Sequence, residues 1–167
     1  GIDNKLGKYT DTEAKIRKIF AKIPDPKKNQ IYLEAVAHLV EALFHQMKYT
    51  EALEFTQEWL NEATAKEQNY NKGLAWHFAA QIAWKSGIPF INYDKDYTVV
   101  ECFEAARDNF VEYETEQAHV LRDWALFEFN LGNVDSAQKV KDQAMPLLIK
   151  LNLDADIDDL NDTIPSI

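Results

Sequence analysis

The sequence predicts an all-α fold in which antiparallel helical hairpins stack as a short right-handed α-solenoid. A helix end, a tight turn and a second helix opening on a small apolar residue recur three times, at 47–52, at Gly87 with 96–99, and at 132–137. Periods of about 35 to 45 residues mark stacked helical hairpins. Apolar residues at helical spacing fill the segments between these turns, so no β-strand is required.

The N-terminal part predicts two helices. Thr10-Asp11-Thr12-Glu13 has the capping-box pattern, so a leading helix is expected over about 11–23, before Pro24 and Pro26 stop it. The next helix, over about 30–47, carries one broad apolar stripe: Leu33, Val36, Leu39, Val40, Leu43, Phe44 and Met47.

Polar residues and a glycine mark the ends of the next two predicted helices. Thr50 is expected to cap a helix that reaches about Lys66, and Asn69 to Asn71 supply a polar break. A helix over about 72–86 then ends at Gly87, where glycine adopts a left-handed conformation at little cost.

An insertion separates Gly87 from the next helix. The segment 88–97 contains too many aromatic residues for a solvated loop, so we expect it to fold back on the repeat; the alternative is that it forms part of a binding surface. Thr98-Val99-Val100-Glu101 is a second capping box, and its helix is expected to reach about Tyr113.

Two long helices are expected next, over about 116–131 and 134–151, separated by Gly132-Asn133. The C-terminal segment 154–167 is the most acidic part of the chain, and a short helix is expected over about 154–162. We interpret its aspartates as a solvated face rather than a partner-binding tail.

Charge limits the classes of partner. The 167 residues carry a formal net charge of -10. Residues 1–28 hold eight Lys/Arg and four Asp/Glu, a net of +4, which leaves -14 for the remainder. Because phosphate neutralisation needs a basic face, this balance argues against general nucleic-acid binding.

Cysteine usage and hydropathy indicate a cytoplasmic protein. The single cysteine, Cys102, cannot form an internal disulfide, which fits a reducing compartment. No stretch of about 18 uncharged apolar residues occurs, and residues 1–30 carry alternating charges where a signal peptide would be apolar. We therefore expect no membrane partner.

The small and large residues around the turns resemble the tetratricopeptide repeat family. The middle copy matches at Trp76, Ala79, Ala80, Ala83, Gly87, Phe103 and Ala106, and the last at Leu121, Ala125, Gly132, Ala137 and Ala144. The first copy matches at Leu39, Tyr49 and Ala52 but departs from the motif at Val40 and Trp59. The resemblance implies repeats over about 31–66, 72–113 and 116–151.

The whole chain, 1–167, is expected to be a single repeat domain and a fragment of a longer protein. The leading helix is similar to the second helix of a hairpin, because Tyr9-Thr10-Asp11-Thr12-Glu13-Ala14 imitates Tyr49-Thr50-Glu51-Ala52. The closing segment is similar to the C-terminal ends of repeat regions in bacterial signalling ATPases and transcription regulators. That similarity implies a larger signalling or regulatory parent.

Catalytic patterns are weak, so we predict no enzyme activity and no cofactor. The five glycines are isolated and form no phosphate-binding loop. No Gly-x-Ser-x-Gly elbow is present, and Cys102 has no histidine nearby in sequence.

A metal-binding helical bundle is the enzyme-class alternative. Glu34, His38, Glu41 and His45 share one helical face, and Glu116 with His119 forms a Glu-x-x-His pair. Ferritin-like centres need two such pairs and two further glutamates from four helices. Four ligands along one helix spread over more than about 15 Å, too far to share one ion. We predict no metal site.

By analogy with the family, the first helix of each hairpin lines a concave groove. Carried over by position, this groove comprises Glu34, Ala37, His38, Glu41, Phe44, His45, Leu74, His77, Phe78, Gln81, Trp84, Lys85, His119, Arg122, Asp123, Leu126, Phe129 and Asn130. Aromatic anchors mixed with charges are typical of a binding surface. The prediction is a non-enzymatic protein or peptide interaction module; the alternative is an effector- or peptide-sensing regulatory domain with a hinge near 88–97.

Overall fold

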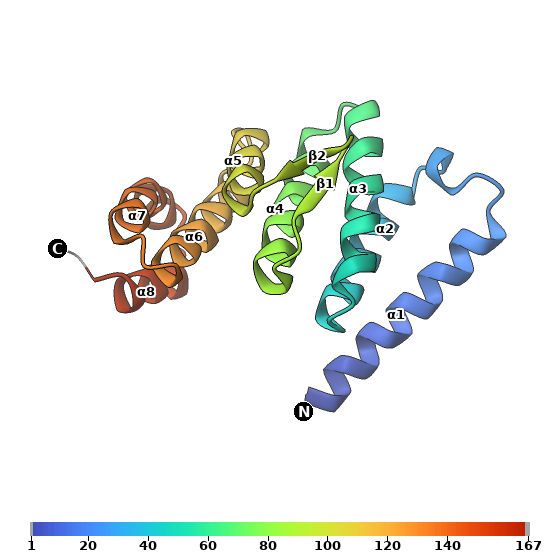
Figure 1. Cartoon of the computed structure of the whole chain (residues 1–167), viewed down its shortest axis with the longest axis horizontal. Helices are drawn as coiled ribbons and strands as arrows, with labels where there is room; N and C mark the ends of the chain where they lie inside the picture. The colour runs from blue at the N-terminus through green and yellow to red at the C-terminus, as the bar shows by residue number, and fades with distance from the viewer. Residues whose placement is uncertain (1, 166–167) are drawn as a thin grey trace. The chain divides into compact units, whose positions relative to one another are not determined.

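The computed structural model describes residues 2–165, with side chains from residue 4 onward (Figure 1). Within this range most residues are helical, and consecutive helices pack against each other. The prediction of a helical fold is therefore confirmed at this level. Residue 1 and residues 166–167, which belong to the predicted domain and to the predicted acidic segment, lie outside the described part.

The chain divides into two compact units, one reaching to Cys102 and one starting at Phe103. The first unit contains α1 (Ile2–Lys22), the short 3-10 helix η1 (Pro26–Lys28), α2 (Tyr32–His45), α3 (Tyr49–Ala65), α4 (Asn69–Ser86), β1 (Phe90–Asn92) and β2 (Lys95–Tyr97). Helix α5 (Val99–Asn109) contains the boundary. The second unit continues with α6 (Glu114–Asn130), α7 (Val134–Lys150) and α8 (Asp154–Thr163).

The expectation that no strand is present was wrong. The inserted segment forms an antiparallel hairpin with Phe90 opposite Tyr97 and a turn at Tyr93 and Asp94, both at positive φ. Phe90 is fully buried, and its ring meets that of Trp76 edge-on, with ring centroids 5.5 Å apart. The prediction that this segment folds back is thus confirmed, because one strand residue supplies an aromatic anchor onto α4.

Four helices, α2, α3, α6 and α7, end in the same left-handed turn. The residue with positive φ is Met47, Glu67, Gly132 and Asn152, respectively. In each turn the next backbone N–H donates to a carbonyl five residues earlier, for example Lys48 to Leu43 at 2.9 Å. A helix end that is closed by two backbone hydrogen bonds in this way favours glycine at the position with positive φ, yet only one of these four turns has glycine there. Packing therefore holds the three others in a conformation that costs roughly 1–2 kcal/mol.

Two of the predicted helix starts were wrong and one is confirmed. Thr10 and Thr12 lie inside α1, where their hydroxyls donate to the carbonyls of Leu6 and Lys8 at 3.1 and 2.9 Å. Lys48, not Thr50, precedes α3. At α5, however, the Thr98 hydroxyl accepts from the Glu101 N–H and the Glu101 carboxylate accepts from the Thr98 N–H, both at 3.1 Å.

Two other boundaries move. The polar residues Asn69 to Asn71 belong to α4, and the break lies at Lys66 to Gln68 with Glu67 in the left-handed region. Helix α5 ends at Asn109, four residues before the expected Tyr113. Gly87 closes α4 with φ 72°, as predicted.

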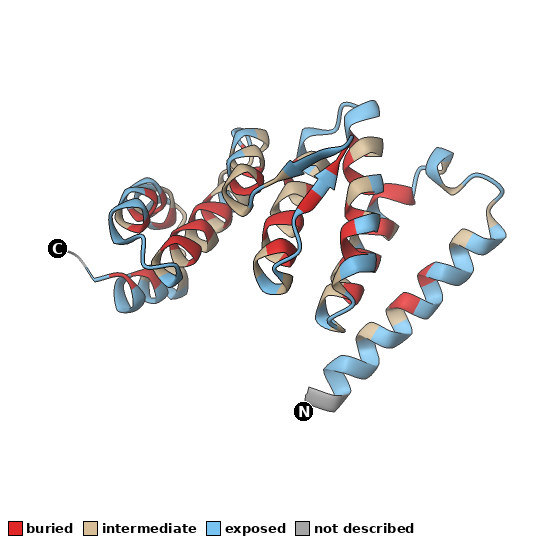
Figure 2. Cartoon of the chain, viewed as in Figure 1, coloured by how far each residue is buried: buried red, intermediate tan, exposed pale blue. Residues whose placement is uncertain are grey.

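Small residues let the helices of the first unit approach closely. Ala79 and Ala80 of α4 are fully buried, and α4 packs against both α2 and α3. The apolar stripe of α2 fills the space between these helices, with Val36, Leu39, Val40 and Leu43 completely shielded from solvent. In Figure 2 α1 is mostly exposed, with buried positions near its middle, whereas buried residues are frequent on α3 and α4.

Replacing Ala80 by leucine should lower the free energy of unfolding by about 1–3 kcal/mol, because three added heavy atoms would overpack a fully buried site. Urea denaturation of the two proteins measures this difference. The matched control is Ala14→Leu on the exposed side of α1, which we expect to change stability by less than about 0.5 kcal/mol. An unchanged midpoint for Ala80→Leu would contradict the close crossing.

The acidic C-terminal helix is docked on the second unit. Leu160 and Ile164 are buried, and α8 packs against α6 and α7. The ammonium of Lys141, itself only 3% exposed, donates to the backbone carbonyl of Ile164 at 2.5 Å. A cation at a helix C-terminus is favourable because it meets the negative end of the helix dipole.

Candidate functional site

The predicted groove residues lie on α2, α4 and α6. Helices α2 and α4 belong to the first unit and α6 to the second. The two sets are therefore described separately, one on the α2 and α4 surface and one on the α6 surface.

A cleft of about 400 Å³ opens between α2 and α4, above α3. We call it the α2–α4 cleft. It is lined by Glu34, Ala37, His38 and Glu41 of α2, Trp59 of α3, and Tyr70, Asn71, Leu74 and Phe78 of α4. The predicted residues Glu34, His38, Glu41 and Phe78 are thus brought together from two helices that are far apart in sequence.

The floor of the cleft is aromatic. Trp59 is fully buried, and its indole N–H donates to the side-chain oxygen of Asn71 at 3.2 Å. The ring centroids of Trp59 and Phe78 are 5.9 Å apart. The ring of Phe78 in turn meets that of Phe44 edge-on, with centroids 6.4 Å apart. This row fixes the orientation of Phe78, since each ring is held by a neighbour from another helix.

Six predicted groove residues of this unit do not line the cleft. Phe44 supports it from behind, and His45 is stacked on Tyr9 of α1, with ring centroids 4.4 Å apart and planes 14° apart. His77, Gln81 and Trp84 are half-buried, and Lys85 is exposed. His45 thus packs against α1 and does not line the cleft.

In the second unit the α6 surface holds α8. The Arg122 guanidinium pairs with Asp123 at 2.9 Å and with Asp156, and Asp156 also lies 3.5 Å from His119. Burial alone would lower the pKa of Arg122, but Asp123 and Asp156 raise it overall, so the guanidinium remains charged. Phe129 is half-buried and Asn130 exposed. Asp156 of the acidic helix α8 thus pairs with two predicted groove residues, Arg122 and His119.

Sequence reasoning missed three lining residues, Trp59, Tyr70 and Asn71. Trp59 lies on the second helix of its hairpin, and the two α4 residues were assigned to a break between helices. One signal could have indicated Trp59, because it departs from the alanine that is usual at this position in the family that the sequence resembles. A large side chain at that position reaches through to the cleft.

The single thiol is not a nucleophile. Cys102 is fully buried, and this burial, with the negative charge of Glu101, raises the pKa of its thiol to about 12. Because the thiolate is the reactive form, Cys102 stays protonated and inert at neutral pH. It packs as a small apolar residue.

The candidate metal ligands are spread out. His45 is stacked on Tyr9, and His119 is directed at Asp156. Within residues 2–165, no three His, Cys, Asp or Glu side chains lie close enough together to hold one ion. The face of α2 that carries Glu34, His38 and Glu41 instead borders the α2–α4 cleft.

Two further findings concern membrane-spanning helices and similarity to known proteins. None of the helices in the described part of the chain is both long and apolar enough to cross a membrane. Comparisons with protein-family models, with curated proteins and with solved structures each found no match to this chain.

Proposed function

We propose that this chain is a non-enzymatic interaction domain of the tetratricopeptide type, which binds a protein or peptide segment. The observation that carries the proposal is the α2–α4 cleft, whose floor is aromatic and whose rim is charged. Both features come from helices that a solenoid would present on one face. A cytoplasmic location and a larger regulatory parent are part of the same proposal.

The cleft selects its ligand by shape and charge. An apolar side chain of the partner would be buried against Leu74 and Phe78, which are half-exposed in the free chain. The carboxylates of Glu34 and Glu41 would accept hydrogen bonds from backbone N–H groups or from a lysine or arginine beside that side chain. The favoured ligand is therefore an extended or helical segment with an apolar residue next to a basic one.

The regulatory alternative needs a hinge near 88–97. That segment is a hairpin anchored by the buried Phe90 and Asn92, and the boundary between the two units lies further on, at Cys102. We therefore favour a binding module whose cleft lies within one unit, without a moving part at the insertion.

Peptides selected from a random display library against the chain should bind in the α2–α4 cleft. Leu74→Ala is expected to weaken the tightest peptide about fivefold or more, because it removes half of the apolar contact, and Glu41→Gln should weaken basic peptides. Isothermal titration calorimetry gives the dissociation constants.

Lys139→Ala on the exposed surface of α7 is the control for general effects of substitution. Binding that persists unchanged in Leu74→Ala and Glu41→Gln would place the ligand elsewhere on the chain. A library that yields no binder at all would remove the proposed function.

A further inference from the structure

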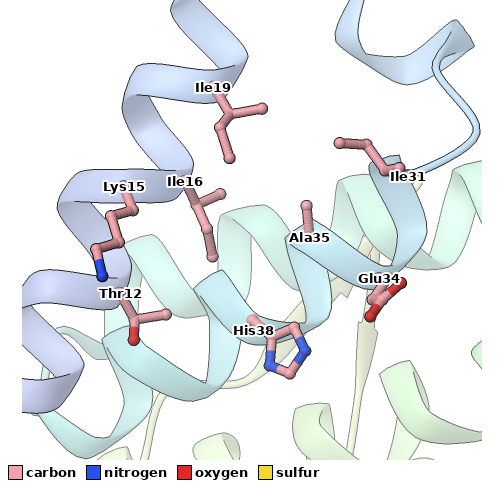
Figure 3. A pocket seen from close by; sticks show the side chains of 8 residues that line it. All are labelled: Thr12, Lys15, Ile16, Ile19, Ile31, Glu34, Ala35 and His38. Atoms are coloured by element: carbon pink, nitrogen blue, oxygen red, sulfur yellow. The ribbon is translucent and has the colours of Figure 1, made fainter.

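A second concave site lies between α1 and α2. This α1–α2 groove has a volume of about 380 Å³ and is lined by Thr12, Lys15, Ile16, Ile19, Ile31, Glu34, Ala35 and His38. Figure 3 shows Ile16 and Ile19 of α1 on one side of an open space, and Ile31, which precedes α2, and Ala35 of α2 on the other. Ile19 and Ile31 are 39% and 47% exposed, which is high for isoleucine and leaves an apolar surface uncovered.

The pair α1 and α2 repeats the pair α3 and α4. Lys8-Tyr9-Thr10 and Lys48-Tyr49-Thr50 are identical and 40 positions apart, and Ala35 and Ala75 have the same spacing. In both pairs the two helices pack directly against each other. At this spacing Thr12, Ile16 and Ile19 correspond to Ala52, Thr56 and Trp59.

The two pairs differ in what covers them. Ala52, Thr56, Trp59 and Ala75 are all fully buried, and α2 packs against both α3 and α4. The corresponding Thr12 and Ala35 are half-buried, and Ile19 is exposed. The α1–α2 groove is therefore the site on which a helix sits in the neighbouring copy. There the helix contributes apolar residues spaced i, i+3, i+4 and i+7, at Val36, Leu39, Val40 and Leu43.

Charge indicates the chemistry of the helix that fits. Lys8, Lys15, Lys18 and Lys22 are exposed and spaced by seven, three and four residues, which places them along one side of α1. None of them forms an ion pair with a described side chain, and Asp11 is the one acidic residue in their row. The opposite rim carries Glu34. An incoming helix thus meets a basic flank on α1 and an acidic residue on α2.

We propose that the α1–α2 groove binds an amphipathic helix of another protein, with apolar residues at i, i+3, i+4 and i+7 and acidic residues along the side that faces α1. This goes beyond the proposed function, since the groove is a second site that shares only Glu34 and His38 with the α2–α4 cleft. Burial of Ile19 and Ile31 supplies affinity, and the four lysines set the direction in which the helix lies.

The probe is a fluorescent helical peptide of about 16 residues, with leucine at i, i+3, i+4 and i+7 and glutamate along one flank. We expect the full chain to raise its anisotropy, and Ile19→Asp to weaken binding about tenfold or more. Ile149→Asp is the matched control, because Ile149 is an exposed isoleucine on α7, 59% accessible. It should bind the peptide like the unchanged chain.

Charge exchange tests the orientation. Lys15→Glu with Lys18→Glu should weaken the glutamate peptide and strengthen a peptide that carries lysine on the same flank. Leu74→Ala, which is expected to weaken binding in the α2–α4 cleft, should leave this peptide unaffected, so failure of the groove and failure of the cleft are distinguishable. Melting curves of all variants confirm that each is folded.

Several results would overturn the proposal. One is equal binding of acidic and basic peptides, and another is normal binding by Ile19→Asp. A dimer in analytical ultracentrifugation that Ile19→Asp converts to monomer would assign the groove to a second copy. A last possibility is that the peptide binds this chain but does not bind a longer natural polypeptide that contains it. That result would assign the groove to a helix of the same polypeptide.

Discussion

Replacement of Trp59 by alanine is expected to lower the free energy of unfolding by about 3–5 kcal/mol. The side chain is fully buried, packs against Phe78 and donates a hydrogen bond to Asn71. Its removal leaves a cavity beneath the α2–α4 cleft and an amide without its donor. Chemical denaturation followed by circular dichroism measures the loss.

Trp59→Phe separates the two contributions. This variant retains much of the ring packing and loses the hydrogen bond to Asn71, so it should cost less than the alanine variant, about 1–2 kcal/mol. Val111→Ala, at a site that is 65% exposed, is the control and should change stability by less than about 0.5 kcal/mol. A loss below about 1 kcal/mol for Trp59→Ala would show that Trp59 does not support the cleft.

Acid should weaken the attachment of α1. The Glu13 carboxylate accepts hydrogen bonds from Lys48 at 2.8 Å, Arg17 at 2.7 Å and Gln46 at 3.0 Å. Burial alone would raise the pKa of Glu13, but these three donors together lower it from 4.5 to about 2. The folded state therefore favours the charged form of Glu13. Its hydrogen bonds with Lys48 and Gln46 link α1 to the turn between α2 and α3.

The direction of the pH effect follows from this lowered pKa. The contribution of Glu13 is fully present above about pH 4.5, where the carboxyl is ionised in both states, and it is lost as pH falls toward 2. Glu13→Gln should thus be less stable than the unchanged chain by about 2–3 kcal/mol at neutral pH. The difference should narrow below pH 4.5 and vanish near pH 2.

Denaturation midpoints of Glu13→Gln and the unchanged chain, compared from about pH 7 down to pH 2, test this expectation. Glu104→Gln on the exposed side of α5 is the control for a glutamate-to-glutamine change that breaks no hydrogen bond to α1. A constant gap between Glu13→Gln and the unchanged chain across this range would mean that Glu13 acts through packing alone.

Features set by nearby residues were predictable. The Thr98 and Glu101 capping box and the left-handed Gly87 depend on neighbours within a few positions, and both are confirmed. The apolar stripe of α2 is confirmed except at Met47, which lies beyond the helix end and is 73% exposed. Ala79 and Ala80, which match small-residue positions of the family that the sequence resembles, are likewise fully buried.

Local pattern misled where distant packing decides. Thr10 to Glu13 has the residues of a capping box, yet α1 continues through it, and Glu13 bonds to Lys48 and Gln46 instead of a helix N-terminus. Met47 and Glu67 adopt a left-handed conformation that their side chains disfavour, because the next helix must turn back at once. The insertion forms a hairpin whose Phe90 packs against Trp76 of α4.

The sequence by itself determined that this chain forms helices, where most of them turn, and which faces are apolar, because those properties depend on contacts between residues a few positions apart. Only the tertiary structure decided which surfaces remain open. His38, Glu41 and Phe78 share a cleft, His45 is stacked on Tyr9, and Arg122 is paired with Asp156 of α8. These outcomes depend on how helices separated by 30 or more residues pack together, and no local periodicity contains that information.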